Sequence, residues 1–211
     1  MVSAGNGFSL LLKYDGTVIA RGNAGRQWSA LDEHADVESR RKAIWSRRTC
    51  TIPTFPNNWT CTQIAAGGGH SLLLMSAGEV LAFGNNGNGQ CQVPSLAPHP
   101  KPYDGTQLAY TQVDAGGAHS LLLRSDGKVE AFGWNSSGQC EIPDIEEGME
   151  YTKVAAGGAH SLLLKKDGTV TACGMNSDGR CDIPALPPGL RYTHVAASGP
   201  ALPPGLHGRF L

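Results

Sequence analysis

The chain has 211 residues, 40% of them hydrophobic and 17% charged, and it contains 28 glycines. This composition is typical of a globular β protein with many turns and excludes a chain that is disordered throughout. The formal net charge is −1, whereas proteins that contact nucleic acid phosphates usually have a basic face, so no nucleic acid partner is expected.

Residues 1 to about 53 form the first of four related units. From Ser3 the chain runs SAGNGFSLLLKYDGTVIARGN, and the pattern resumes at Cys50 after an insertion at 27–48. Val2 aligns with Val154 of the last complete unit, so most of the first strand is missing. The Leu-Leu-Leu run lacks the basic start of a signal peptide, and no apolar run reaches the roughly eighteen residues of a membrane span. We expect an intracellular protein, in the cytoplasm or the nucleus.

The insertion at 27–48 has a helix-like composition. Its acidic residues come early and its basic residues late, an order that suits the helix dipole. Arg40, Arg41 and Lys42 are therefore candidates for binding a partner, either on a protruding element or as a nuclear-import patch. Two alternatives stay open, namely a solvated surface loop and a stretch of non-coding sequence translated in error.

Three further units align without a gap. They occupy residues 61–96, 110–145 and 151–186, and the last of them reads TKVAAGGAHSLLLKKDGTVTACG followed by MNSDGRCDIP. Self-similarity at a period of roughly 40 to 50 residues indicates a propeller or a solenoid.

Each unit is predicted to contain three strands and no helix. The short apolar run Leu162-Leu163-Leu164 ends at Asp167-Gly168, a strong hairpin signal. The alternating stretch 169–173 follows the turn, and 151–156 precedes the Gly-Gly pair before the run. A further short extended segment is predicted at 181–183. Small sheets without helices must bury their faces against one another, which in radial repetition makes a β-propeller.

The last part of the chain opens a fifth unit and does not finish it. Residues 192–199 align with 151–158, but residues 200–211 repeat the sequence ALPPGL in place of a hairpin and are expected to be a frayed tail. We expect an incomplete arc of four blades plus one strand. The arc is a fragment of a longer chain, the alternative that we favour, or it associates with another copy to complete the ring, or its ends stay open.

The repeated run AAGGGHSLLL, which begins at Ala65, and its counterparts resemble the signature of the regulator-of-chromosome-condensation repeat family. The Gly-Gln-Cys-x-Ile-Pro tail is similar to the short-repeat branch, whose layout is that of the β-lactamase inhibitor protein II propeller. The resemblance covers residues 1 to about 199 apart from the insertion. It implies an all-β, seven-bladed propeller fold. The first unit departs from it with Phe8 in place of histidine, and the third departs with Asp114 in place of alanine.

Each complete unit also repeats a histidine followed by serine. A hydrolase needs one nucleophile, one base and one orienting acid at a single place, and three equivalent pairs instead indicate a structural task in each blade. The resemblance implies that the histidine braces its loop by a hydrogen bond to the backbone. A metal ring and catalysis are the weaker alternatives, and we expect no metal, cofactor or catalytic residue. The repeated positions are His70, His119 and His160, with Gly67, Gly116 and Gly157 in the preceding turn.

Four cysteines share one position in successive units: Cys50, Cys91, Cys140 and Cys181. Equivalent positions on neighbouring blades should lie beyond the roughly 7 Å between Cα atoms that a disulfide allows, and the spacing matches no zinc pattern. We therefore expect a small buried residue used once per blade.

The function expected from the sequence is a non-catalytic platform for protein binding, with the partner held by loops at the blade rims. Trp134 stands in such a loop, where the other units have Asn85 and Met175, and is a candidate binding hot spot. The family resemblance implies a small GTPase or a ubiquitination substrate as the partner. The alternatives are the recognition fragment of a ubiquitin ligase, a guanine-nucleotide exchange factor and a chromatin-associated propeller.

Overall fold

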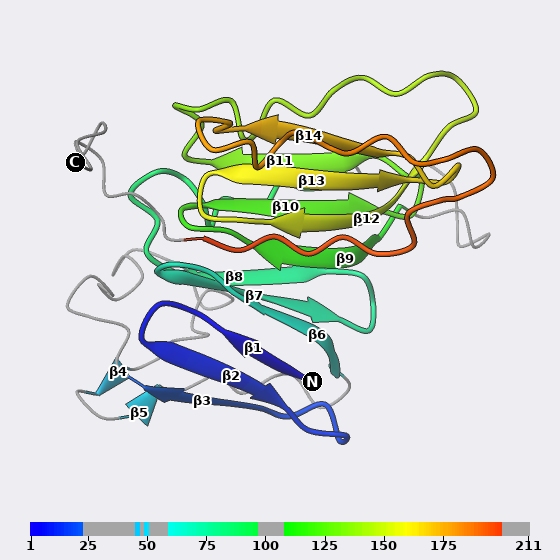
Figure 1. Ribbon diagram of the computed structural model, residues 1–211. Helices are drawn as coiled ribbons and strands as arrows, with labels where there is room; N and C mark the ends of the chain where they lie inside the picture. Colours follow the sequence, from blue (N-terminus) through cyan, green and yellow to red (C-terminus); the bar gives the residue numbers. More distant parts are fainter. Residues whose placement is uncertain (23–44, 47–48, 51–58, 97–107, 200–211) are drawn as a thin grey trace, which may run out of the picture.

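The computed structural model describes residues 1–22, 45–46, 49–50, 59–96 and 108–199. Within them, four three-stranded antiparallel sheets follow one another along the chain (Figure 1). The insertion with Arg40, Arg41 and Lys42 lies outside the described residues, as does the tail after residue 199. No described segment forms a helix that could cross a membrane.

The first sheet consists of β1 (Val2–Ala4), β2 (Phe8–Leu12) and β3 (Val18–Gly22), and the second of β6 (Cys61–Ala66), β7 (His70–Met75) and β8 (Val80–Gly84). The third consists of β9 (Tyr110–Ala115), β10 (His119–Arg124) and β11 (Val129–Gly133), and the fourth of β12 (Tyr151–Ala156), β13 (His160–Lys165) and β14 (Val170–Gly174).

Two very short strands, β4 (Trp45–Ser46) and β5 (Thr49–Cys50), pair with each other near β3. They are the only described part of the segment between the first and second sheets before residue 59.

The histidine-to-leucine run forms the middle strand of each complete unit, as predicted. The hairpins after these strands turn at Gly78, Gly127 and Gly168, whose φ angles are 80°, 76° and 84°. Only glycine adopts this left-handed conformation without steric cost, which is why the turn recurs with glycine in the same place. The prediction of a short extended segment at 181–183 was wrong, because Cys181 lies in a turn and the next two residues belong to no strand.

Alternate leucines of each middle strand face opposite neighbours. In the second sheet, Leu73 packs toward the first sheet, with Phe8 and Leu10. Leu72 and Leu74 pack toward the third sheet, with Val113 among others. The third and fourth sheets meet in the same manner. The hydrophobic core therefore lies between the sheets. Each fully buried leucine in it stabilises the fold by roughly 1.5–3 kcal/mol.

The sheets are arranged as a fan around a common side. The first strands β1, β6, β9 and β12 contact one another in succession. Figure 1 shows the first sheet (blue), then the second (teal), and then the third and fourth, which overlap in this view. A hollow of about 500 Å³ lies along this inner side. Residues 197–199 border the same hollow, so the beginning of the fifth unit lies next to the fourth sheet. The expected arc of four blades is confirmed, whereas residues 192–199, which were expected to form one further strand, belong to no strand or sheet.

Candidate functional site

The histidine of one sheet bonds to the serine of the next. His70 Nε2 lies 2.9 Å from Ser120 Oγ, and His119 Nε2 lies 3.1 Å from Ser161 Oγ. All four side chains are buried. The predicted structural role therefore has a different partner from the one that the family resemblance implied: the bond joins two blades through side chains, and does not brace the histidine's own loop through the backbone.

The serine hydroxyls determine the tautomer of these histidines. Ser120 Oγ donates to the carbonyl oxygen of Gln90 at 2.7 Å, and Ser161 Oγ donates to that of Gln139 at 2.8 Å. Each hydroxyl has a single proton, so it accepts its second bond from a protonated Nε2. Burial lowers the pKa of His70 and His119 to about 4, which keeps both rings neutral at neutral pH.

These His–Ser pairs do not resemble a hydrolase centre. Among the residues that the structure describes, the buried Nδ1 atoms of His70, His119 and His160 have no hydrogen-bond partner, whereas a catalytic histidine is oriented by an acid at that nitrogen. The serine proton is also committed to a backbone carbonyl. The pairs therefore act as joints between sheets.

The Gly-Gly turns, which recur in the three complete units, allow the sheets to approach closely on the inner side. A Cβ atom at Gly67 would lie 2.5 Å from the Gly116 carbonyl oxygen and 2.6 Å from His70 Cε1. Gly116 has the same relation to Gly157 and His119. The amide of the second glycine donates to the next sheet, from Gly68 to Gly116 at 3.0 Å and from Gly117 to Gly157 at 3.1 Å. The repeated glycine is thus required by backbone contact between blades.

Two glutamines, which the sequence prediction missed, clamp the inner strands together. Gln63 Nε2 donates to the Val113 carbonyl at 3.1 Å, and Gln63 Oε1 accepts from the Val113 amide at 3.0 Å. Gln112 makes the same pair of bonds with Val154. The signal was present, because glutamine occupies the same position in two units, while Lys153 takes that position in the fourth.

Asp114, noted above as a departure from the repeat, joins the third sheet to the fourth. Its Oδ2 accepts from the Ala156 amide at 2.8 Å and its Oδ1 accepts from the Ala115 amide at 2.9 Å. Burial raises the pKa of Asp114 to about 6 despite these two bonds. Ser3 has a similar role at the joint between the first and second sheets, where its Oγ accepts from the Ala66 amide.

The polar tails after β8 and β11 stabilise their own turns. Asn86 Oδ1 accepts from the Cys91 amide, and Gln90 Oε1 accepts from the Asn88 amide, both at 2.9 Å. Asn135 and Gln139 repeat the arrangement. In both tails these side chains therefore satisfy amides of their own loop.

The shared cysteine position is half-buried rather than buried. The Sγ atoms of Cys91, Cys140 and Cys181 contact the backbone oxygens of Asn85, Trp134 and Met175 at 3.4–3.5 Å. All three thiols are free, and burial raises the pKa of Cys91 and Cys140 to about 12. No group of three or more metal-ligating side chains occurs in the part of the chain that the structure describes. The side chain of Cys50 lies outside it.

Trp134 follows β11 at the same rim as the Gly-Gly turns. Its amide donates to the Ala118 carbonyl at 2.8 Å, and the residue is half-buried. This rim carries the polar tails of the complete units, with Gln90 and Gln139 in the second and third units and Arg180 in the fourth. The structure therefore places the predicted hot-spot residue on a rim loop.

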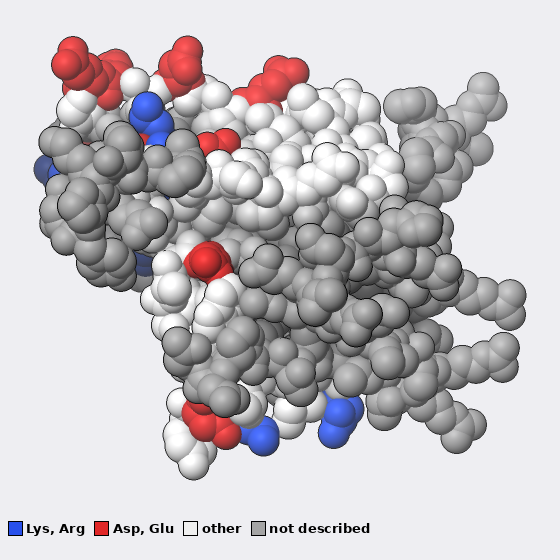
Figure 2. All heavy atoms as spheres, turned by 180° about the vertical axis from the view of Figure 1, so that it is seen from behind, with Lys and Arg blue, Asp and Glu red and all other residues white. Residues whose placement is uncertain are grey.

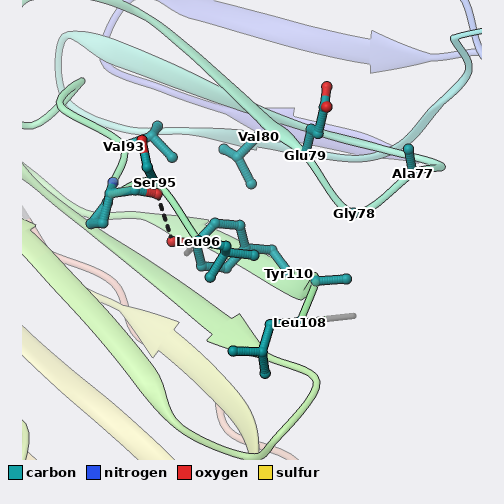
Figure 3. Close-up of a pocket in the computed structure, with 11 residues that line it drawn as sticks. Ala77, Gly78, Glu79, Val80, Val93, Ser95, Leu96, Leu108 and Tyr110 are labelled. Carbon is teal, nitrogen blue, oxygen red and sulfur yellow. Dashed lines mark hydrogen bonds between the residues drawn. The ribbon is translucent and has the colours of Figure 1, made fainter. Parts of the chain in front are cut away.

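The opposite rim has a hollow of about 660 Å³ between the second and third sheets (Figure 3). Val80, Leu96 and Tyr110 line it with apolar surface, and Glu79 lies at its edge. Tyr110 is fixed there by its hydroxyl, which donates to the Pro94 carbonyl at 3.0 Å. A side chain with an apolar body could enter this hollow.

Acidic side chains gather along one edge of the described surface. Figure 2 shows acidic side chains along the upper edge of the molecule and only isolated basic groups on the same face. The exposed acidic residues in the connection between the third and fourth sheets are Glu141, Asp144, Glu146, Glu147 and Glu150.

Three segments of the chain match the family profile named "Regulator of chromosome condensation (RCC1) repeat": residues 61–90, 110–139 and 151–180. The first unit, with Phe8 in place of histidine, is not among the matched segments. No curated protein sequence matches the chain.

Solved structures with the same fold include human WBSCR16, at 22% identity and a TM-score of 0.62 over 83% of this chain and 48% of that one. Prp20p from Saccharomyces cerevisiae, studied for its binding to Gsp1p and histones, has 23% identity and a TM-score of 0.63 over 87% of this chain and 45% of that one. Yeast RCC1 (Prp20) bound to Kap60 has 22% identity and a TM-score of 0.65 over 94% of this chain and 52% of that one. The chain thus spans about half the length of these structures, and its four sheets are blades of the same type of propeller.

Proposed function

We propose that this chain, which carries repeats of the regulator of chromosome condensation type, is a non-catalytic platform that binds another protein through its rim segments. The observation that carries the proposal is the use of the repeated polar side chains. The histidines, serines and glutamines of the framework bond to neighbouring sheets or to their own turns, so the groups free to recognise a partner are those that differ between units.

The hairpin turn of the second sheet, which borders the 660 Å³ hollow, differs from the corresponding turns of the other sheets. In the first, third and fourth sheets, the turn aspartate accepts a backbone amide two residues on: Asp15 from Thr17, Asp126 from Lys128 and Asp167 from Thr169. The second sheet has Ala77 at that position and cannot form the bond. Its turn therefore presents apolar surface beside Val80 and Tyr110, a composition suited to a buried apolar anchor from a partner protein.

The relatives support a protein as the partner class. Prp20p was studied for its binding to Gsp1p and histones, and yeast RCC1 was solved bound to Kap60. Within this proposal, the finer classes are a small GTPase or a ubiquitination substrate. Faster nucleotide release from a purified GTPase on addition of the chain would support an exchange role, and an unchanged rate for every GTPase tried would leave the ligase-associated role. The short Gly-Gln-Cys-x-Ile-Pro tails are the basis for assigning the chain to the short-repeat branch.

Site-specific photo-cross-linking in cells tests the platform directly. A photoreactive side chain at Glu79, in the hollow, or at Trp134, on the opposite rim, should give a discrete adduct with one protein. An excess of the unlabelled chain should compete the adduct away. The matched control is the photoreactive group at Lys166, in the equivalent turn of the fourth sheet, which should give none. Adducts of equal strength at all three positions, or none that is competed, would contradict the proposal.

A further inference from the structure

Corresponding positions on the first sheet and on the inner sheets differ sharply in exposure. Val2 is 74% exposed, whereas its counterparts Val113 and Val154 are 1% and 2% exposed. Leu11 is 37% exposed, and its counterpart Leu122 is fully buried. In every other sheet these side chains pack on the preceding sheet. The first sheet therefore presents the face that elsewhere covers a neighbour.

The other end of the arc presents the complementary face. The Tyr192 amide donates to the Gly168 carbonyl at 2.9 Å and its hydroxyl donates to the Pro184 carbonyl at 2.7 Å. Tyr110 and Tyr151 make the same two bonds at the internal joints. Residues 192–199 thus lie as the inner strand of a following blade. Leu162 beside them is half-buried, although Leu72 and Leu121 at that position are fully buried.

Polar groups at the two ends also match. At the internal joints, a histidine Nε2 bonds to the serine of the next sheet. His160, in the fourth sheet, has no hydrogen bond from Nε2 within the described residues, and Ser9, at the serine position of the first sheet, has none from Oγ. A first sheet placed after a fourth sheet would bring these two atoms together.

Strand pairing favours the same arrangement. β1 supplies three residue pairs to β2, with Val2 opposite Leu11. In the complete fourth sheet, β12 supplies five pairs to β13, with Val154 opposite Leu163. Residues 192–197 align with β12, so they could pair along β2 with Val195 in the place of Val2. The longer strand offers more backbone hydrogen bonds than β1 does.

We propose that two copies of this chain associate head to tail. The β2–β3 hairpin of each copy packs on the fourth sheet of the other and pairs with its residues 192–197, which replace β1. The partner is a second copy because the new joint repeats the three joints within the chain. The stoichiometry is two because the arc covers 45–52% of the length of the solved chains with this fold. Two equivalent joints close a two-fold symmetric ring.

Sedimentation of the 211-residue chain over a range of concentrations tests the proposal. The expected result is a species with twice the mass of one chain. Leu11→Glu, on the face of the first sheet, and Leu162→Glu, on the fourth, should each lower the mass to that of a single chain. The control Tyr14→Glu, at a fully exposed residue in the β2–β3 turn, should leave the dimer intact.

Mixing the two variants separates head-to-tail association from other arrangements. The Leu162→Glu chain has an intact first sheet and the Leu11→Glu chain has an intact fourth sheet, so one joint of the ring can form and the mixture should regain a dimer. That recovery would also show that both variants are folded. A wild-type chain that stays monomeric, a mixture that stays monomeric, or a dimer that survives removal of residues 191–211 would overturn the proposal.

Discussion

Ser71, Ser120 and Ser161 are buried at one position of the repeat, yet they differ in what they bond. Ser120 and Ser161 each take part in two hydrogen bonds across a joint. Within the described part of the chain, Ser71 Oγ is buried with no partner, and Phe8 stands where the preceding sheet would have the histidine that bonds to it. The same amino acid therefore contributes differently to stability in successive blades.

Replacing these serines with alanine should measure that difference. Ser120→Ala and Ser161→Ala each remove a bonded hydroxyl and leave a histidine Nε2 unpaired, which costs about 1–3 kcal/mol of unfolding free energy. Ser71→Ala removes an unpaired hydroxyl and should change stability by less than about 0.5 kcal/mol or raise it. Urea denaturation of the three variants checks this. Equal losses in all three would show that the His–Ser bonds contribute nothing.

The pH dependence of stability should depend on Asp114. Its pKa is raised to about 6, so its contribution is present below pH 4 and is lost as the pH rises through 6. The pKa values of His70 and His119 are lowered to about 4, so their contributions are present above pH 6.5 and are lost as the pH falls through 4. The carboxyl group thus partly offsets the histidines during acidification.

Asp114→Asn should therefore lose more stability than the wild type does between pH 6.5 and pH 4. The additional loss is on the order of 1–2 kcal/mol, since the carboxyl is only partly buried. The measurement is unfolding free energy at a series of pH values. Asp144→Asn, at an exposed position, is the control and should follow the wild type. A shallower acid loss in Asp114→Asn would contradict the assignment.

The elements of the chain were largely predictable, and the joints between them were not. Leucine runs, Asp-Gly turns and Gly-Gly pairs are local signals, so they predict strands and hairpins correctly. The bonds of Gln63 and Asp114 cross to residues 42 or more positions away, and no local pattern predicts which group lies opposite. The sequence indicated a structural role for the histidine, but its serine partner could be identified only when the sheets were placed side by side.

The Gly-Gly turns set the spacing of these elements. In Gly116→Ala, a Cβ atom would lie 2.4 Å from the Gly157 carbonyl oxygen and 2.3 Å from His119 Cε1, so the third and fourth sheets must move apart. We expect a loss of about 3 kcal/mol, the upper end of the usual range for overpacked sites. Gly87→Ala is the control, because its nearest neighbour would be a side-chain atom at 3.4 Å. Thermal denaturation compares the two, and similar melting temperatures would contradict the close-approach role.

The whole molecule should be least stable at its first sheet. Repeat proteins gain stability from each neighbour, and terminal repeats have fewer neighbours than internal ones. The first sheet also has no His–Ser bond to the second. In dilute solution, where the ends stay uncovered, hydrogen exchange should be faster for amides of β2 than for those of β10. Equal protection of the two strands would mean that the arc opens only as one unit.

The joints share one chemistry, and this makes the blades interchangeable. A chain lacking residues 110–150 would place the fourth sheet directly after the second. Gln63 would then meet the backbone of Val154, and His70 would meet Ser161, with the same groups that now join consecutive sheets. Such a shortened chain should fold with its remaining units unchanged. A gene that encodes such repeats can gain or lose a whole blade, because the new neighbours form the same contacts as the old ones.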